Sequence, residues 1–477
     1  MIDFQTTWWP ADQERLTLYA QLDQMFLSKH REAFARLSGK LPKHLANKAY
    51  ISQDYPKFIS STWAGLLFGR PPVISTPIPA EQSSLNTIMA SNRLATIFYE
   101  SELACSSRGD AVLRLSTGSR HPGGPVEVLI EEVPAYSYFA ECDPDNQRRI
   151  LSQCLAWERT IGEGDKLKRY LRVEHHGAGW IRNELYPITG LTKVGPAVPL
   201  STLYGEDAPP EYIETGVGVP LLFHLPNELY GCAHYGMSDY TPTLVGLFDE
   251  ANQRITGIAD VLDRHKDPKL ILPTGVLDRR GQIKTEDLEI IEVAPEDASS
   301  NAPRLLTWDA QLDSSFKMLD EVDSAILKFA QISAAWARQD AGNIDSAPAF
   351  NRCFAQMLAR LTLKQSYREP VIKQMLYTAM QLNAILGNGP APTAPPEVLW
   401  SNGLPKDDKE MTEVAAAAVG AGFMSKLTAI RYTRQVGEAE AMAELARIDE
   451  ERADDPPPPP ALPMQPDPES SGTEIPS

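Results

Sequence analysis

Residues 221–275 read LLFHLPNELYGCAHYGMSDYTPTLVGLFDEANQRITGIADVLDRHKDPKLILPTG. The apolar run 219–223 predicts a buried strand, and Thr241 with Pro242 is typical of an N-cap followed by the first helical position. Apolar residues then recur every three or four positions, which predicts one amphipathic helix. They are Leu244, Leu247, Phe248, Ala251, Ile255, Ile258 and Leu262. Pro268 ends this helix, and a new extended segment begins at Lys269.

Composition narrows the class of protein. The chain has 477 residues, enough for two to four domains, and its hydrophobic fraction of 43% is that of a globular protein. It holds no apolar run of about 18 residues, so we expect no transmembrane helix and no secretory signal. The five scattered cysteines, without a CxxC motif, suit a reducing cytosol. A net charge of −18 argues against wrapping nucleic acid, but not against letting DNA slide past.

Before residue 221, the spacing of apolar residues changes once, from a helical to a strand-like period. Residues 12–41, 51–70 and 84–105 each predict a helix with one apolar side. From 110 to 186 the period becomes two, with turn residues between short apolar runs. This pattern predicts an antiparallel β-meander whose strands are 112–115, 126–132, 136–141, 150–157, 169–174 and 180–186.

The segments after it are mainly helical. Residues 269–308 predict a small mixed insert, and 311–335 predict a helix. A polar break, 338–348, precedes the longest helical pattern, 349–386, in which Pro370 must introduce a kink. A Pro-rich linker at 389–396 leads to three further helices, at 409–419, 425–433 and 438–453. After Asp454 the Pro-rich composition predicts disorder. The fold class is therefore α+β, mostly α-helical with one β-meander.

Motifs that carry catalysis are absent from the sequence. It contains no phosphate loop of the GxxxxGK[ST] type, no HExxH, no GxSxG and no Cys/His cluster with metal spacing. His175 and His176 are adjacent in a predicted strand and point to opposite faces, so we interpret them as surface polarity. His224, His234 and His265 match no metal motif and are expected to be satisfied or exposed polar residues. We therefore predict no catalytic residue, no cofactor, no metal and no enzyme activity.

Several short sequence motifs resemble those of the portal proteins of long-tailed double-stranded DNA bacteriophages, the SPP1-like portal family, and they occur in the same order as in that family. They are Tyr55-Pro56-Lys57-Phe58 through 67–72 (LFGRPP), 224–227 (HLPN), 236–239 (GMSD), 247–252 (LFDEAN), 400–406 (WSNGLPK), 425–430 and 438–452. One departure is the sequence Asp345-Ser346-Ala347-Pro348, where that family has a Ser-Gly pair before the long helix.

The resemblance implies a portal-protein fold and a homo-oligomeric ring, usually of twelve subunits, at one vertex of the capsid. Double-stranded DNA would pass through its channel during packaging, retention and ejection. The implied partners are the terminase large subunit, the head–tail adaptor and the major capsid protein or scaffold, with no membrane. The implied location is the virion, and the host cytoplasm during assembly. A scaffold or adaptor that forms no ring, and an enzyme with an unrecognised site, remain the alternatives.

The resemblance also assigns parts to the chain. It implies a wing at 1–240, stem helices at 241–266 and 311–337, a clip at 267–310 and a tunnel loop at 338–348. The long kinked helix is 349–388, the linker 389–404, the crown 405–453 and the tail 454–477.

Two groups of polar residues are candidate contact sites. By its position, the tunnel loop would approach DNA with Arg338, Gln339, Asp340, Gly342, Asn343 and Asp345, although a passive connector is the alternative. A basic cluster near the clip is either a solvated turn or a contact for an acidic partner or exiting DNA. Its candidate residues are Arg264, Lys266, Lys269, Arg279, Arg280 and Lys284.

Overall fold

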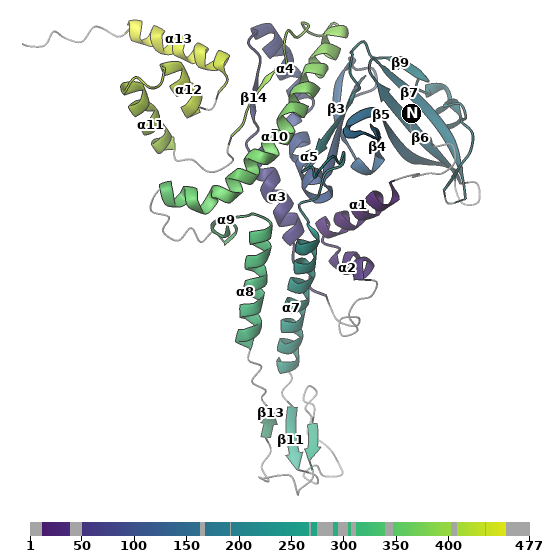
Figure 1. The fold of residues 1–477 in the computed structure, drawn as a ribbon, viewed down its shortest axis with the longest axis vertical. Coiled ribbons are helices and arrows are strands. Elements are labelled where there is room, and N and C mark those ends of the chain that lie inside the picture. Colours follow the sequence, from purple (N-terminus) through teal and green to yellow (C-terminus); the bar gives the residue numbers. More distant parts are fainter. Residues whose placement is uncertain are drawn as a thin grey trace, which may run out of the picture. The chain divides into compact units, whose positions relative to one another are not determined.

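Helix α7, Pro242–Lys266, lies between strand β10, Leu222–Pro226, and strand β11, Lys269–Pro273 (Figure 1). A computed structural model of the chain thus confirms the predicted order of strand, helix and strand, but the first strand spans Leu222–Pro226 instead of 219–223. The structure describes residues 12–38, 50–162, 167–190, 192–266, 269–273, 290–293, 304–306, 312–338, 347–401, 408–434 and 436–454. The chain divides into two compact units, Met1–Pro405 and Lys406–Ser477. Within the described ranges, no helix combines the length and hydropathy needed to span a bilayer.

Among the described residues of the first unit, five helices come before strand β2 (Asp110–Gly118). They are α1 (Gln13–Phe26), α2 (His30–Ser38), α3 (Tyr55–Phe68), α4 (Pro79–Ser91) and α5 (Leu94–Arg108). The single helices predicted at 12–41 and 84–105 are therefore wrong, because each is divided in two. Ser28 (φ 60°) and Arg93 (φ 50°) adopt the left-handed conformation at the breaks, which stops helix propagation.

The predicted meander forms two sheets instead of one. Strands β2 (Asp110–Gly118) and β3 (Glu127–Val133) join β10 in a three-stranded sheet of order β10-β2-β3. The larger sheet has the order β4-β5-β6-β7-β8, with β9 paired to β7. Its strands are β4 (Tyr138–Asp143), β5 (Asn146–Ile161), β6 (Lys168–Gly177), β7 (Trp180–Thr189), β8 (Lys193–Val194) and β9 (Tyr212–Glu214). Three short helical turns, η1 (Ala135–Ser137), α6 (Ser201–Tyr204) and η3 (Gly205–Asp207), connect them.

Hydrogen bonding explains why β2 leaves the meander. Strand β10 pairs antiparallel with β2, with Phe223 opposite Leu113. This pairing ties the strand before α7 directly to the strand after α5. The principal apolar core then forms where α3, α5, α7, α8 and α10 meet, with Trp63, Phe98, Phe248, Ile326 and Leu376 all buried.

Helix α8 (Leu312–Phe329) packs against α7, and Figure 1 shows the two side by side. A small sheet, in which β11 pairs parallel with β12 (Ile290–Val293) and antiparallel with β13 (Arg304–Leu306), lies between them in the chain. The predicted helix at 311–337 is not continuous. It ends at Phe329, and a separate short helix, α9 (Ala334–Arg338), follows.

Helix α10 (Ala347–Ile385) contains Pro370, and Figure 1 shows that it changes direction along its length. After α10, still within the first unit, strand β14 (Glu397–Leu399) pairs antiparallel with β1 (Val73–Ser75). The second unit contains α11 (Asp408–Gly420), α12 (Lys426–Arg434) and α13 (Glu438–Asp454). The predicted Pro-rich tail lies outside the described residues.

The end of α8 generates a stability prediction. Gln331 has φ 57°, and the backbone N–H of Ile332 donates to the Leu327 carbonyl oxygen at 2.9 Å, so the helix ends in a Schellman motif. Glycine adopts this conformation without the steric penalty of a Cβ atom. Replacing Gln331 by Gly should therefore raise the free energy of unfolding by about 1 kcal/mol in denaturant titrations. Gln331→Ala keeps the penalty and should give no gain; equal stabilisation by both variants would contradict the explanation.

Candidate functional site

The loop between β10 and α7 closes the C-terminal end of α5. The backbone N–H of Asp239 donates to the Ser106 carbonyl oxygen at 2.9 Å, and the Ser238 hydroxyl donates to the Ser107 carbonyl oxygen at 2.6 Å. These carbonyls belong to the last turn of α5, where no partner exists within the helix. The loop therefore satisfies the end of one helix just before it starts the next.

Two glycines allow this close approach. Gly109, which follows α5, has φ +100°, and its carbonyl accepts a 2.7 Å hydrogen bond from the Asn227 N–H. A Cβ atom at Gly109 would lie 2.5 Å from the carbonyl oxygen of Gly236 in the loop. Side chains are therefore excluded at this contact, and the sequence has glycine where a positive φ requires it.

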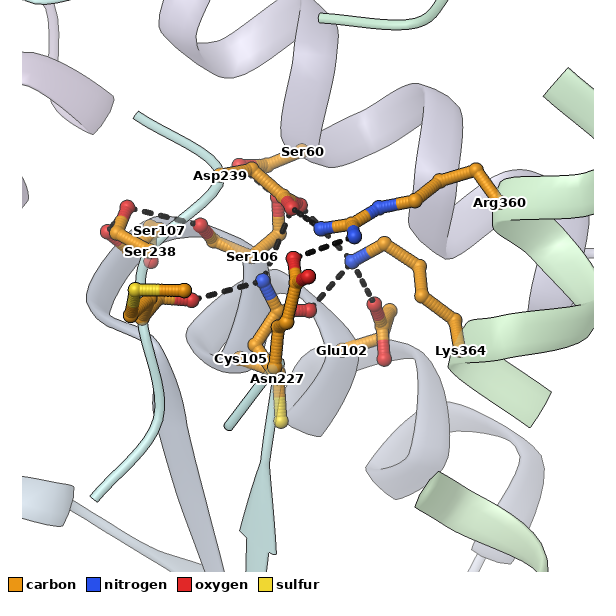
Figure 2. Close-up of polar contacts among 12 residues, drawn as sticks. Ser60, Glu102, Cys105, Ser106, Ser107, Asn227, Ser238, Asp239, Arg360 and Lys364 are labelled. Carbon is orange, nitrogen blue, oxygen red and sulfur yellow. Dashed lines mark hydrogen bonds and ion pairs between the residues drawn. The ribbon is translucent and has the colours of Figure 1, made fainter. Parts of the chain in front are cut away.

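Three cations of α10 meet this loop, and Figure 2 shows two of them, Arg360 and Lys364. Arg360, Lys364 and Arg368 are spaced four residues apart, so they lie on one face of the helix. The Lys364 ammonium lies 3.1 Å from Glu102 of α5 and 2.9 Å from Asp239 of the loop. We call these three cations, with Glu102, Asn227 and Asp239, the junction network.

The two other cations complete the junction network. The Arg368 guanidinium donates to Glu102 at 2.7 Å and to the Pro226 carbonyl at 2.6 Å. Arg360 pairs with Asp239 at 3.0 Å and also with Glu228. Asn227 accepts hydrogen bonds from both Lys364 and Arg368. The network thus joins α5, the end of β10, the loop and α10.

The network is dry. Lys364 and Arg368 are each 1% exposed, and Glu102 is fully buried. Burial alone would raise the pKa of Asp239, but the positive charges of Lys364 and Arg360 hold this pKa well below its usual range. Asp239 is therefore ionised, and its charge is balanced by α10 rather than by water.

A second polar cluster ties α1 to the same loop. The Asp110 carboxylate accepts a hydrogen bond from the Tyr19 hydroxyl and lies 2.6 Å from the His224 Nε2 atom. The His234 ring lies 4.6 Å from that of His224, between centroids. Burial, together with the neighbouring His224, lowers the pKa of His234 to about 4. His234 is therefore neutral near pH 7, and both described histidines have polar partners or packed neighbours.

The interpretation of His175 and His176 as surface polarity is wrong. Both side chains are buried, His175 at 3.1 Å from Glu184 and His176 at 2.8 Å from Glu174. Consecutive residues are buried along this part of β6, so both faces of the sheet are covered there and alternation does not place either histidine in solvent. Among the residues that the structure describes, no group of three or more His, Cys, Asp and Glu side chains is arranged to hold a metal ion.

A groove of about 920 Å³ lies beside the junction network, between α1 and the facing ends of α7 and α8. Its walls are mainly apolar, with Leu18, Leu22, Val245 and Phe329 among them. The cations at its edge already have carboxylate partners: Arg15 binds Asp12, Arg108 binds Asp23 and Arg360 binds Glu228 and Asp239. The groove therefore suits packing or docking, and its charged groups are engaged in structural pairs.

The residues predicted from the sequence as contact sites are elsewhere. Arg338 is the last residue of α9, and Arg264 and Lys266 occupy the last turn of α7, while Lys269 begins β11. The other predicted residues lie outside the described ranges: Gln339, Asp340, Gly342, Asn343, Asp345, Arg279, Arg280 and Lys284. Their roles stay predictions.

The junction network was missed by the sequence analysis. Two of its members, Asn227 and Asp239, fall in phrases that carried the family resemblance, but no role followed from them. The signal that was present is the run of cations at 360, 364 and 368, the first two flanked by Ala359, Leu361 and Leu363. Such a row indicates buried partners, because an unpaired cation is rarely placed in a core.

The chain is similar to a known protein family in sequence and to solved structures in fold. A family model described as "Phage portal protein, SPP1 Gp6-like" matches residues 7–457. No curated protein matches the chain. Among solved structures, the neck of an empty gene transfer agent particle matches with 13% identity and a TM-score of 0.46, covering 82% of this chain and 93% of that chain. The virion of a native gene transfer agent particle matches with 13% identity and a TM-score of 0.44, covering 91% and 95%.

The match over most of the chain places it in a class of structural virion proteins, and not among enzymes. The chain belongs to the phage portal protein family, SPP1 Gp6-like. The predicted family, the α+β fold class and the location in the virion are thereby confirmed.

The junction network predicts a large effect of one substitution. Replacing Lys364 by Met removes one of the two cations that pair with each of the buried carboxylates Glu102 and Asp239, which should lower the free energy of unfolding by roughly 3 kcal/mol. Lys373→Met, on the same helix, removes only a half-buried pair with Glu369 and should cost about 0.3–0.5 kcal/mol. Denaturant titration of both variants measures the difference; similar losses would contradict the role of burial.

The lowered pKa of Asp239 predicts that the folded protein loses stability in acid. Its pKa is lower in the folded than in the unfolded chain, so its contribution is complete above the ordinary aspartate pKa of about 3.9 and is lost as pH falls through the lower folded value. The free energy of unfolding should therefore fall below about pH 4. The decline should be shallower in Asp239→Asn, although this variant is less stable at pH 7. Identical slopes in the two proteins would show that other carboxylates cause the decline.

Proposed function

We propose that this portal protein assembles into a closed ring, of twelve copies as is usual in its family, around a channel for double-stranded DNA at the capsid vertex. The ring serves genome packaging, retention of the packaged DNA and its ejection. Its partners are the terminase large subunit during packaging and the head–tail adaptor afterwards, with the major capsid protein or scaffold around it. Assembly takes place in the host cytoplasm.

The observation that carries this proposal is the surface of α8. Val322 and Ile326 are buried toward α7, yet Phe316 is 46% exposed and Met318 is 41% exposed. At about 100° per residue these two side chains point to opposite flanks of the helix. Large apolar groups on both flanks suit a helix with a neighbour on each side. A closed ring provides this arrangement, since each copy contacts one neighbour with each of two different faces.

The charge of the chain fits a conduit. With a net charge of −18, the protein does not gain affinity for DNA through the release of counterions. DNA inside such a ring stays mobile along the channel. The same reasoning makes a protein that stores or wraps DNA a poor alternative.

The parts of the chain take the following roles in the proposal. Helices α7 and α8 form the stem, the segment 267–310 between them forms the clip, and 338–348 forms the tunnel loop. The wing is 1–240, the long helix is 349–388 and the crown is 405–453, preceded by the linker 389–404 and followed by the tail 454–477. Pro370 directs the bend of the long helix.

Native mass spectrometry and negative-stain imaging of the purified chain test the proposal. We expect rings, and a monomer or dimer under all conditions would favour a scaffold or adaptor that forms no ring. Phe316→Asp should abolish rings, because a carboxylate would be buried in each contact between copies. Lys317→Asp adds the same group on the side of α8 that points away from α7, and should retain rings. Folding of each variant is checked by its thermal transition.

A further inference from the structure

An arginine in the larger sheet is buried without a carboxylate partner. Arg172, in β6, is 3% exposed, and within the described ranges its hydrogen bonds go only to neutral groups. Glu174, two residues further along the strand, pairs instead with Arg114 at 3.4 Å and with His176 at 2.8 Å. Arg114 is also paired with Glu131. A buried cation without an adjacent anion lowers the stability of a fold, and such departures are typical of functional positions.

The guanidinium of Arg172 also has donors to spare. Its Nη1 atom donates to the backbone carbonyl oxygens of Val173 and Glu184, and its Nη2 atom donates to the Asn183 Oδ1 atom at 2.5 Å. The Nε–H has no acceptor among the described residues, and Nη2 carries a second hydrogen. Nε and Nη2 together form the side of a guanidinium on which a carboxylate accepts two parallel hydrogen bonds. This side of Arg172 is therefore suited to a carboxylate.

Arg172 lines a cavity of about 490 Å³ in the first unit. Residues of β2, β5, β6 and β7 surround this cavity, together with the last turn of α10. Trp157 of β5 packs over the guanidinium, with 5.7 Å between the centroid of its ring and Cζ. The remaining wall is mainly apolar and includes Ile181, Tyr204, Ile213, Leu221, Leu382 and Ile385. We call this space the Arg172 cavity, and its volume is within the range of small-molecule sites.

The charges of the Arg172 cavity narrow the chemistry of its ligand. Arg114, Arg172 and Glu174 line its inner part and leave one net positive charge. Asp207 and Glu214 also line the cavity and are exposed, so they lie at its mouth. These two carboxylates repel phosphates and nucleic acid, whose charge a single arginine does not balance. A single carboxylate on an apolar or aromatic body fits both the cation and the walls.

We infer that the Arg172 cavity binds a monocarboxylate with an apolar or aromatic body, and that Arg172 holds the carboxylate through Nε and Nη2. The carboxylate supplies the negative charge and the acceptors that the described part of the chain does not give to Arg172. The body of the ligand packs against Trp157 and the apolar wall. This chemistry occurs in free organic acids and at an acidic side chain between apolar residues of a polypeptide. The inference is independent of the proposed ring, because residues of one copy form the cavity.

Calorimetric titration of the purified full-length protein tests this inference. The probes are 3-phenylpropionate, as a free acid, and a blocked tripeptide with glutamate between two leucines. Binding of either probe supports the site: the first indicates a free acid, and the second indicates an acidic side chain of a partner polypeptide. The neutral 3-phenylpropanamide should bind at least about tenfold more weakly than 3-phenylpropionate, since it lacks the charge that Arg172 pairs with.

Two results of these titrations would overturn the inference. One is the absence of binding by both acids, and the other is equal binding of 3-phenylpropionate and its amide. Neither result depends on the oligomeric state, so each would leave the proposed ring intact. Conversely, a protein that binds the acid but forms no ring would overturn the proposed function alone.

Substitutions locate the site. Arg172→Met should weaken the binding of the acid probe at least about tenfold, because it removes the cation and both donors. Arg169→Met is the matched control: it removes an arginine of the same strand that is already paired with Glu158 at 2.8 Å, and it should retain binding. Ile213→Trp, at a wall position that is 36% exposed, narrows the cavity without altering Arg172 and should also weaken binding.

The thermal transition of each variant, measured without ligand, separates lost binding from lost folding. Ile213→Trp decides the matter if Arg172→Met does not fold, because its exposed position tolerates a larger side chain. Wild-type affinity in Ile213→Trp or in a folded Arg172→Met protein would overturn the assignment of the Arg172 cavity. Loss of binding in Arg169→Met alone would overturn it as well.

Discussion

Burial of the Lys364 ammonium between Glu102 and Asp239 is the constraint on which the first unit depends. A charge in a dry interior requires opposite charges at short range, and these come here from two segments distant in the chain. Arg360 and Arg368 extend the same row, so α10 is held against α5 and the loop along several turns. Apolar packing tolerates small displacements, whereas the geometry of this network does not.

The position of the network gives it a mechanical consequence. Asp239 lies three residues before α7, and its backbone N–H closes the end of α5 while its carboxylate binds α10. The helix that we assign to the stem therefore begins at a point fixed to both other helices. A displacement of α10 must move the start of α7 or break a buried ion pair. The junction network thus provides a rigid coupling between the wing and the stem of the proposed portal.

Differences between sequence and structure have local and tertiary causes. The three helices predicted as continuous end at Ser28, Arg93 and Gln331, each left-handed although none is glycine. Glycine or asparagine usually marks such helix ends, and neither occupies these three positions. The apolar periodicity therefore predicted helices that continue through these positions. The pairing of β10 with β2, across more than a hundred residues, divided the predicted meander, and no local pattern records a pairing of that length. His175 and His176 alternate correctly along β6 but are covered on both faces.

Local patterns along the chain were enough to locate most of the helices and strands and to identify the family. Apolar spacing located α7, α8 and α10, alternation located the strands from β2 to β7, and the ordered phrases identified a phage portal protein. These signals are local, because a period or a phrase is contained within one segment. Contacts between distant segments, in contrast, bring Glu102, Asn227, Asp239 and Lys364 together and join β2 to β10. Each of these depends on which distant segments become neighbours, a property that no single segment contains.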